Sequence, residues 1–275
     1  MPELPDPDPD LPAASRPTAA VELASSETGD GPPLVILPGL FGSKRNWASL
    51  ARTFGERHRV ITADLRNHGE SPWAEPHRYP ALAADVAALI ERKADGHASV
   101  LGHSMGGKAA MMLAVSRPEL VARLVVVDIA PVASTGTPIA YVRAMRALPL
   151  ERFQRRSEVA DALAGVIPDR AVRNFLSLNA AVGDTGLSWT LNLAALEQDF
   201  EAILGFPELP PGCSFTGPTL FLAGGRSNYL RPEHRSAIER LFPAAIIETI
   251  PDAGHWVHAD APQAFVAAVN RFLET

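Results

Sequence analysis

Short apolar runs alternate with longer helical patterns along most of this chain, and the alternation is the strongest constraint on its fold. Most of the runs are apolar on both faces, as in strands of a sheet that helices cover on each side. They occupy residues 34–37, 60–63, 99–101, 124–127, 219–222 and 246–250. The helical patterns occupy residues 82–93, 108–115, 232–241 and 262–273. This order predicts an α/β fold with a mostly parallel central sheet flanked by helices.

The alternation stops between residues 132 and 213. Helical patterns such as 139–147 and 157–164 occur there, but no convincing strand. We interpret this segment as a helical insertion. Ligands of open parallel sheets bind beyond the carboxyl ends of the strands, so an insertion leaving from a strand end would cover that site as a cap. The predicted core therefore comprises residues 21–131 and 214–275, the cap comprises 132–213, and the Pro- and Asp-rich residues 1–20 form a flexible tail.

A serine motif lies between a predicted strand and a predicted helix. Gly102-His103-Ser104-Met105-Gly106 matches G-x-S-x-G, and its flanks are those that the motif requires. Glycines on either side let the strand and the helix approach closely at a sharp turn, which displays the serine hydroxyl. We predict Ser104 as a nucleophile, with the N–H of Met105 as one donor to a developing oxyanion.

A serine hydroxyl needs an adjacent base, and the base needs a third group to orient it. His255 follows the last predicted strand, at the edge of the sheet where Ser104 is displayed, and is the predicted base. His258 is the second candidate, with a structural role as its alternative. The two histidines could share a zinc ion by their spacing, but no further ligand set is evident, so no metal site is predicted.

The acid is expected after the strand 219–222, but the loop 223–229 contains no carboxylate. Asp128 instead follows the strand 124–127. A carboxylate buried at a strand end needs a charge-assisted partner, so we predict that Asp128 orients the His255 ring. Two alternatives stay open: Asp128 caps the following loop through backbone amides, or Glu233 is the acid.

The second oxyanion donor is expected in the glycine-rich loop 38–43, where a tight backbone is possible. The N–H of Leu40 is the predicted donor, and that of Phe41 is the second choice. Side chains near these motifs and in the insertion are candidate substrate contacts, with internal packing as the alternative for each. They are Phe41, His103, Trp189 and Trp256.

Taken together, these motifs resemble the α/β-hydrolase superfamily, in particular the short-chain acyl esterases whose charge-relay aspartate follows the family's sixth strand. The resemblance covers about residues 21–275 and rests on segments 39–43, 64–69, 102–107, 127–131 and 254–259. It implies the roles of nucleophile, acid and base for Ser104, Asp128 and His255. Pro38 departs from the pattern, because the family usually has a histidine there whose side chain anchors the oxyanion loop.

Charge and cysteine content exclude several other classes. The net charge is -6 and no run of Lys or Arg occurs, which argues against a nucleic-acid partner or an anionic membrane surface. Cys213 is the only cysteine, so no intramolecular disulfide can form. No apolar stretch is long enough to span a bilayer, and the N-terminus lacks the order of a secretory signal. A cytoplasmic location is therefore predicted.

The predicted activity is hydrolysis of small to medium acyl esters, or thioesters, through an acyl-enzyme that requires no cofactor. Carbon-carbon bond hydrolysis and acyl transfer use the same triad and are alternatives, because fold and triad leave the acyl group open. An alternative that is not an enzyme is a protein of the same fold that binds a ligand without turnover. The sequence leaves the leaving group and the oligomeric state undetermined.

Overall fold

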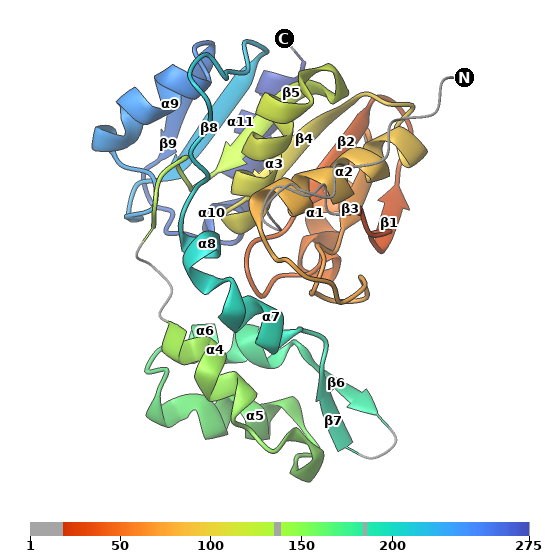
Figure 1. Ribbon diagram of the computed structural model, residues 1–275, viewed down its shortest axis with the longest axis vertical. Helices are drawn as coiled ribbons and strands as arrows, with labels where there is room; N and C mark the ends of the chain where they lie inside the picture. The colour runs from red at the N-terminus through yellow and green to blue at the C-terminus, as the bar shows by residue number, and fades with distance from the viewer. Residues whose placement is uncertain (1–18, 135–138, 184–185, 275) are drawn as a thin grey trace, which may run out of the picture.

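The computed structural model describes residues 19–134, 139–183 and 186–274. A central sheet carries helices on both faces, and a smaller group of helices with one hairpin lies over one end of it (Figure 1). The predicted α/β fold with a mostly parallel sheet is confirmed. Of the predicted tail, only Ala19 and Ala20 belong to the described residues.

The main sheet has seven strands in the order β1-β3-β2-β4-β5-β8-β9. Their bounds are Ser25–Thr28 (β1), Pro33–Leu37 (β2), Arg59–Ala63 (β3), Ala98–His103 (β4), Val121–Val127 (β5), Thr219–Gly224 (β8) and Ala245–Ile250 (β9). All neighbours pair in parallel except β1, which is antiparallel to β3. The sequence did not predict β1, because this polar, partly exposed edge strand has no apolar run.

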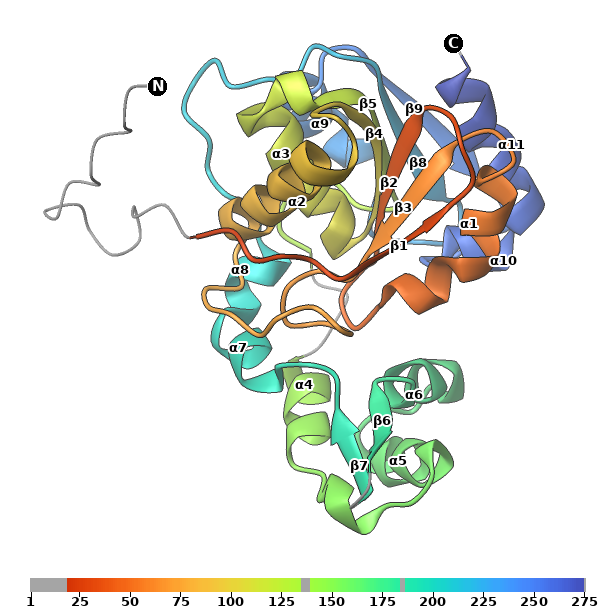
Figure 2. The same ribbon diagram turned by 90° about the vertical axis from the view of Figure 1, so that its right-hand side faces the viewer.

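Helices cover both faces of the sheet, as Figure 2 shows. One face packs against α2 (Tyr79–Lys93), α3 (Met105–Ser116) and α9 (Arg235–Leu241). The other packs against α1 (Ala48–Phe54), α10 (Val257–Asp260) and α11 (Pro262–Leu273). Alternate residues of β2 face the two layers: Val35 and Leu37 the first, Leu34 and Ile36 the second. This two-sided burial explains why the strands are apolar on both faces.

Short 3₁₀ helices join several of these elements. Their bounds are Lys44–Trp47 (η2), Pro118–Leu120 (η3), Leu150–Arg152 (η4), Leu163–Gly165 (η5) and Pro232–His234 (η6). Among the described helices, none is long and apolar enough to cross a membrane.

A cap lies between β5 and β8 in the chain and below the core in Figure 1. It contains α4 (Ile139–Arg146), α5 (Arg156–Ala162), α6 (Arg170–Ser177), α7 (Leu193–Gln198) and α8 (Phe200–Leu204). It also contains an antiparallel hairpin of β6 (Ala180–Gly183) and β7 (Gly186–Trp189). The expectation that this segment holds no strand is wrong, because strands of four residues are too short to show an alternating pattern. The predicted cap boundaries, 132 and 213, stay a prediction.

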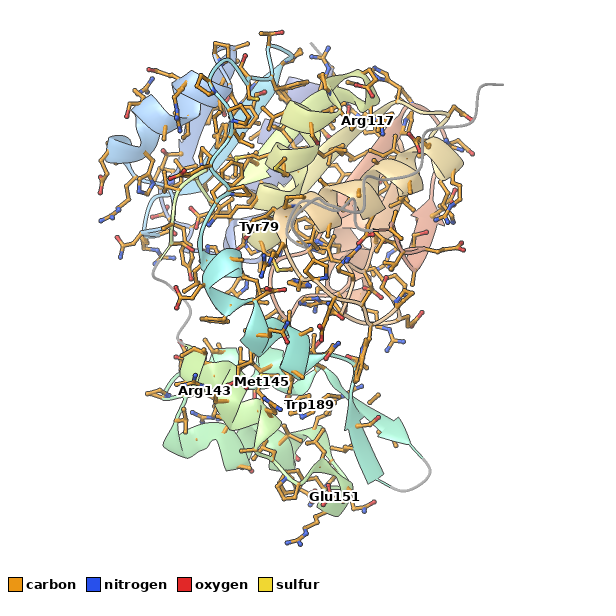
Figure 3. The ribbon with its side chains drawn as sticks, viewed as in Figure 1. Tyr79, Arg117, Arg143, Met145, Glu151 and Trp189 are labelled. Carbon is orange, nitrogen blue, oxygen red and sulfur yellow. The ribbon has the colours of Figure 1, made fainter. Side chains whose placement is uncertain are left out.

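Core side chains from α2 and α3 hold the end of α8 against the core. The Tyr79 hydroxyl, labelled in Figure 3, donates to the Ile203 carbonyl at 2.5 Å. The Lys108 Nζ donates to the Leu204 and Gly205 carbonyls, each at 2.7 Å. Burial lowers the pKa of Lys108 to about 7, whereas the two carbonyl contacts favour its charged form. These bonds satisfy carbonyls that the helix end leaves without intrahelical donors.

Candidate active site

Ser104 occupies the sharp turn between β4 and α3, as the motif predicts. Its backbone has φ 54 and ψ -119, a conformation that non-glycine residues rarely adopt and that costs about 1–3 kcal/mol. The turn depends on glycine at both flanks. A Cβ on Gly102 would lie 2.3 Å from the Gly106 carbonyl oxygen, and one on Gly106 would lie 2.4 Å from those of Leu37 and Pro38. The two glycines therefore let the strand, the helix and the oxyanion loop meet around Ser104.

Three loops bring Ser104, His255 and Asp128 into a hydrogen-bonded row. His255 Nε2 lies 3.1 Å from Ser104 Oγ, and His255 Nδ1 lies 2.7 Å from Asp128 Oδ2. Asp128 is fully buried, whereas His255 is partly exposed. A carboxylate accepts the Nδ1–H, which leaves Nε2 free to accept the proton of the serine hydroxyl. The geometry is that of a nucleophile, a base and an orienting acid.

Asp128 has further partners at the end of β8 and in the loop that follows it, where the sequence lacks a carboxylate. The Gly224 N–H donates to Asp128 Oδ1 at 3.0 Å, and the Ser227 hydroxyl donates to Oδ2. This arrangement differs from the alternative in which Asp128 caps its own following loop, because the amide bonded to its carboxylate belongs to Gly224 of β8. Ser227 was not anticipated from the sequence. Its position, in the loop that usually supplies the acid, could have indicated that it contacts the acid.

Glu233 and His258, the second candidates for the acid and the base, make contacts outside the row of Ser104, His255 and Asp128. Glu233 is exposed and pairs with Arg231 at 3.0 Å. The His258 ring stacks on Trp47 with a centroid distance of 4.2 Å and meets His103 edge-on at 4.9 Å. The geometry therefore favours Asp128 and His255 for these roles.

His103 and Tyr229 enclose the imidazole of His255. His103 Nε2–H donates to the His255 carbonyl at 2.9 Å, and the Tyr229 ring stacks on the His255 ring at 3.7 Å. His103 therefore packs beside His255, as one interpretation of the sequence expected, and its hydrogen bond also holds the backbone of the loop that carries His255. Tyr229 was not anticipated, because its place in a loop carries no periodic signal.

Two successive N–H groups of the loop 38–43, those of Leu40 and Phe41, differ in whether the protein supplies them with an acceptor. Gly39 to Gly42 form a turn closed by a 2.9 Å bond from the Gly42 N–H to the Gly39 carbonyl. The Phe41 N–H donates to His68 Nε2 at 3.2 Å, so the second-choice donor is already engaged. The Leu40 N–H has no acceptor among the described residues. Met105 begins α3, where N–H groups have no intrahelical acceptor.

The family profile described as alpha/beta hydrolase fold matches residues 32–262, which include all of these loops. The chain belongs to the α/β-hydrolase family. The resemblance drawn from the motifs is thereby confirmed.

Several proteins similar to this α/β-hydrolase are named as lipases or esterases. The chain is 45% identical over 250 residues to the mouse (Mus musculus) sn-1-specific diacylglycerol lipase ABHD11, covering 88% of this chain and 81% of the lipase. It is 34% identical over 242 residues to the esterase YbfF of Escherichia coli, covering 88% and 92%. A solved marine microorganism esterase superposes with a TM-score of 0.87 at 32% identity, over 92% of this chain and 100% of the esterase. The prediction of a carboxylesterase-type hydrolase is confirmed.

A cavity of about 220 Å³ opens onto Ser104 and His255 in this α/β-hydrolase. Of the predicted substrate contacts, Phe41, His103 and Trp256 line it. Trp189 is not among its lining residues. It is partly buried in the cap, where it packs against the apolar core (Figure 3). The cap contributes four other side chains to the lining: Tyr141, Val172, Phe175 and Leu176. Phe175 and Leu176 are among the apolar cap residues for which the sequence favoured internal packing, whereas Tyr141 and Val172 were not anticipated.

No group of three or more candidate metal ligands occurs in the part of the chain that the structure describes.

Acid should destabilise this α/β-hydrolase below about pH 6.5, because several histidines are buried as neutral rings. Burial lowers the pKa of His68, lowers those of His77 and His103 further, and lowers that of His258 to about 4. Between each lowered pKa and 6.5 the unfolded state binds more protons than the native state. The free energy of unfolding therefore falls as pH falls, by up to about 1.4 kcal/mol per pH unit for each histidine.

Urea unfolding between pH 7.5 and 5.5 measures this effect. His258→Gln should reduce the slope of unfolding free energy against pH relative to wild type, because it removes one of the histidines whose pKa burial lowers. An unfolding free energy that stays constant across this range would contradict the assignment of neutral buried rings.

Proposed function

We propose that this α/β-hydrolase cleaves acyl esters with apolar acyl chains of small to medium length through a covalent acyl-enzyme on Ser104. The observation that carries the proposal is the row from Ser104 Oγ to His255 Nε2, at 3.1 Å, and from His255 Nδ1 to Asp128 Oδ2, at 2.7 Å. This row opens onto a cavity that can hold the acyl group.

In the first half of the proposed reaction, Ser104 Oγ attacks the carbonyl carbon of the ester while His255 Nε2 takes the hydroxyl proton. The N–H groups of Leu40 and Met105 donate to the resulting oxyanion, and Asp128 stabilises the imidazolium. When the tetrahedral intermediate collapses, the bond to the leaving oxygen or sulfur breaks. His255 returns the proton to that atom, and the acyl group remains on Ser104 as an ester.

In the second half, water replaces the leaving alcohol or thiol. His255 Nε2 removes a proton from the water as its oxygen attacks the acyl carbon, and the same two N–H groups donate to the oxyanion that forms. Collapse releases the carboxylic acid and returns the proton to Ser104. The net reaction consumes one water and needs no cofactor.

The cavity supports an apolar acyl chain of limited length. Its cap side is lined by Tyr141, Val172, Phe175 and Leu176, and the Phe175 ring meets Trp256 edge-on at 5.7 Å. The volume of about 220 Å³ lies below the roughly 300–1,000 Å³ usual for pockets that bind drug-sized ligands. An anionic acyl group would lose hydration on this surface without gaining an ion pair, because no Lys or Arg is among the described residues that line the cavity.

A diacylglycerol is a second candidate substrate for the same site. The mouse relative, 45% identical to this chain, is named an sn-1-specific diacylglycerol lipase. Its substrate also has an ester carbonyl next to an apolar chain, so the same row of residues would act on it.

Hydrolysis of p-nitrophenyl esters from acetate to decanoate, with labelling by a fluorophosphonate, tests the proposal. We expect multiple turnover, an optimum within the series, little activity on a charged ester such as the hemisuccinate, and one label per chain. Diacylglycerol and acyl thioesters, assayed in parallel, identify the leaving group. Labelling without turnover would favour the ligand-binding alternative, and neither turnover nor labelling would overturn the proposal. A cytoplasmic location, expected from the composition, stays a prediction.

A further inference from the structure

The cap contacts the oxyanion loop at Phe41. Asn179, between α6 and β6, donates from Nδ2 to the Phe41 carbonyl at 2.9 Å. Asn179 is 4% exposed and Phe41 is 5% exposed, so water competes little for this bond. The contact joins two segments that lie 138 residues apart in the chain.

This bond begins a chain of hydrogen-bonded peptide groups that ends at the site. The Phe41 carbonyl and the Gly42 N–H belong to one planar peptide group. The Gly42 N–H donates to the Gly39 carbonyl at 2.9 Å, and that carbonyl shares a second planar group with the Leu40 N–H. Because each group is rigid, fixing its carbonyl also fixes its N–H. Hydrogen bonds in such a chain polarise one another, which strengthens the last donor.

The peptide group between these two is held from the core. His68 is fully buried, its Nδ1–H donates to the Arg66 carbonyl at 3.0 Å, and its Nε2 therefore accepts the Phe41 N–H. Arg66 in turn makes two bonds of 2.6 and 2.7 Å to Asp85, so the loop that carries His68 is rigid. His68 thus supplies a histidine anchor for the oxyanion loop, where Pro38 stands at the position usually held by an anchoring histidine.

External support is needed because the loop is strained. Phe41 has φ 64, in the left-handed region that non-glycine residues rarely adopt because of the steric strain on their Cβ. Without its partners, the turn can relax by rotating its peptide groups, which would move the Leu40 N–H away from the carbonyl of a bound ester.

We propose that Asn179 is a positioning residue of the cap that sets the oxyanion hole, acting through the Phe41–Gly42 and Gly39–Leu40 peptide groups, with His68 holding the peptide group between them. This inference rests on the proposed function. It makes the cap part of the machinery that stabilises the transition state, in addition to its role as a cover for the acyl group.

Asn179→Asp tests the proposal, because a carboxylate of the same shape cannot donate to the Phe41 carbonyl. The matched control is Thr190→Val, which removes a 3.1 Å hydroxyl bond to the Asn179 carbonyl and keeps the donor to Phe41. We expect Asn179→Asp to lower kcat for p-nitrophenyl acetate by about 10- to 100-fold with little change in KM. This is less than the roughly 100- to 1,000-fold loss on deleting an oxyanion donor. Thr190→Val should stay within about threefold of wild type.

A second measurement distinguishes a loss of oxyanion stabilisation from a general disturbance of the structure. The affinity for a trifluoromethyl ketone, whose serine adduct has an oxyanion, should fall in parallel with kcat in Asn179→Asp. The affinity for the corresponding alcohol, which forms no adduct, should not change. Asn179→Ala, which has no donor in either protonation state, is measured in the same comparison and carries it alone if Asn179→Asp fails to fold, as judged by its thermal unfolding.

The outcomes distinguish this inference from the proposed function. If wild type hydrolyses esters but both Asn179 variants match Thr190→Val in kcat and ketone affinity, the positioning role is wrong and the serine mechanism stands. If Asn179 variants raise KM and leave kcat unchanged, Asn179 serves substrate binding, and the inference is again wrong. If wild type neither hydrolyses nor is labelled, the proposed function fails and the inference fails with it.

Discussion

Ser104→Ala should lower kcat for ester hydrolysis by about a million-fold and abolish fluorophosphonate labelling. The variant lacks the oxygen that lies 3.1 Å from His255 Nε2, so no acyl-enzyme can form. Alanine adds no atoms to the turn at φ 54, and the fold should be preserved. Initial rates of p-nitrophenyl butyrate hydrolysis and mass spectrometry of the labelled protein measure the two effects.

Ser116→Ala is the matched control for this variant. Ser116 is the last residue of α3, the helix that begins directly after Ser104, and its hydroxyl donates to the Met112 carbonyl at 2.8 Å. Its replacement should leave turnover and labelling near wild type. Turnover by Ser104→Ala within about tenfold of wild type would mean that another residue is the nucleophile.

Asp128→Asn should lower kcat by about 10,000-fold, the second largest effect we expect. The asparagine amide can donate to His255 Nδ1, which favours the tautomer with its proton on Nε2. That tautomer cannot accept the proton of Ser104. The buried site also loses the negative charge that stabilises the imidazolium. The measurement is kcat across pH 6 to 10, together with fluorophosphonate labelling, which should become slow.

Glu233→Gln is the control for the acid. Glu233 is exposed and its carboxylate pairs with Arg231, so its loss should change kcat by less than about twofold. If Asp128→Asn were near wild type while Glu233→Gln were inactive, the acid would be Glu233 and the row seen in the structure would not be the working one.

The cap contributes to the site in two physically different ways. Tyr141, Phe175 and neighbouring side chains supply an apolar wall to the cavity, which acts on the acyl chain through burial. Asn179 instead acts on the backbone of the oxyanion loop through a directed hydrogen bond. A change in acyl preference and a change in kcat should therefore be separable by mutation of the cap.

The sequence by itself determined the fold class and the candidates for the site, because both depend on local patterns. Two-sided apolar runs specify a covered parallel sheet, and Gly102 and Gly106 specify a turn that displays Ser104. The missing carboxylate after β8 pointed to Asp128 by elimination. Elements without a strong local pattern were missed, namely the polar edge strand β1 and the four-residue strands of the cap hairpin.

Only the tertiary structure decided between candidates of the same chemical type. It brought His255, and not His258, to Ser104, engaged the Phe41 N–H with His68, and left that of Leu40 available. The physical reason is distance along the chain. Contacts such as Asn179 with Phe41 join residues 138 positions apart, and they form only when the cap packs on the core. No periodicity or spacing in the sequence encodes such a contact, since its geometry depends on the packing of the whole domain.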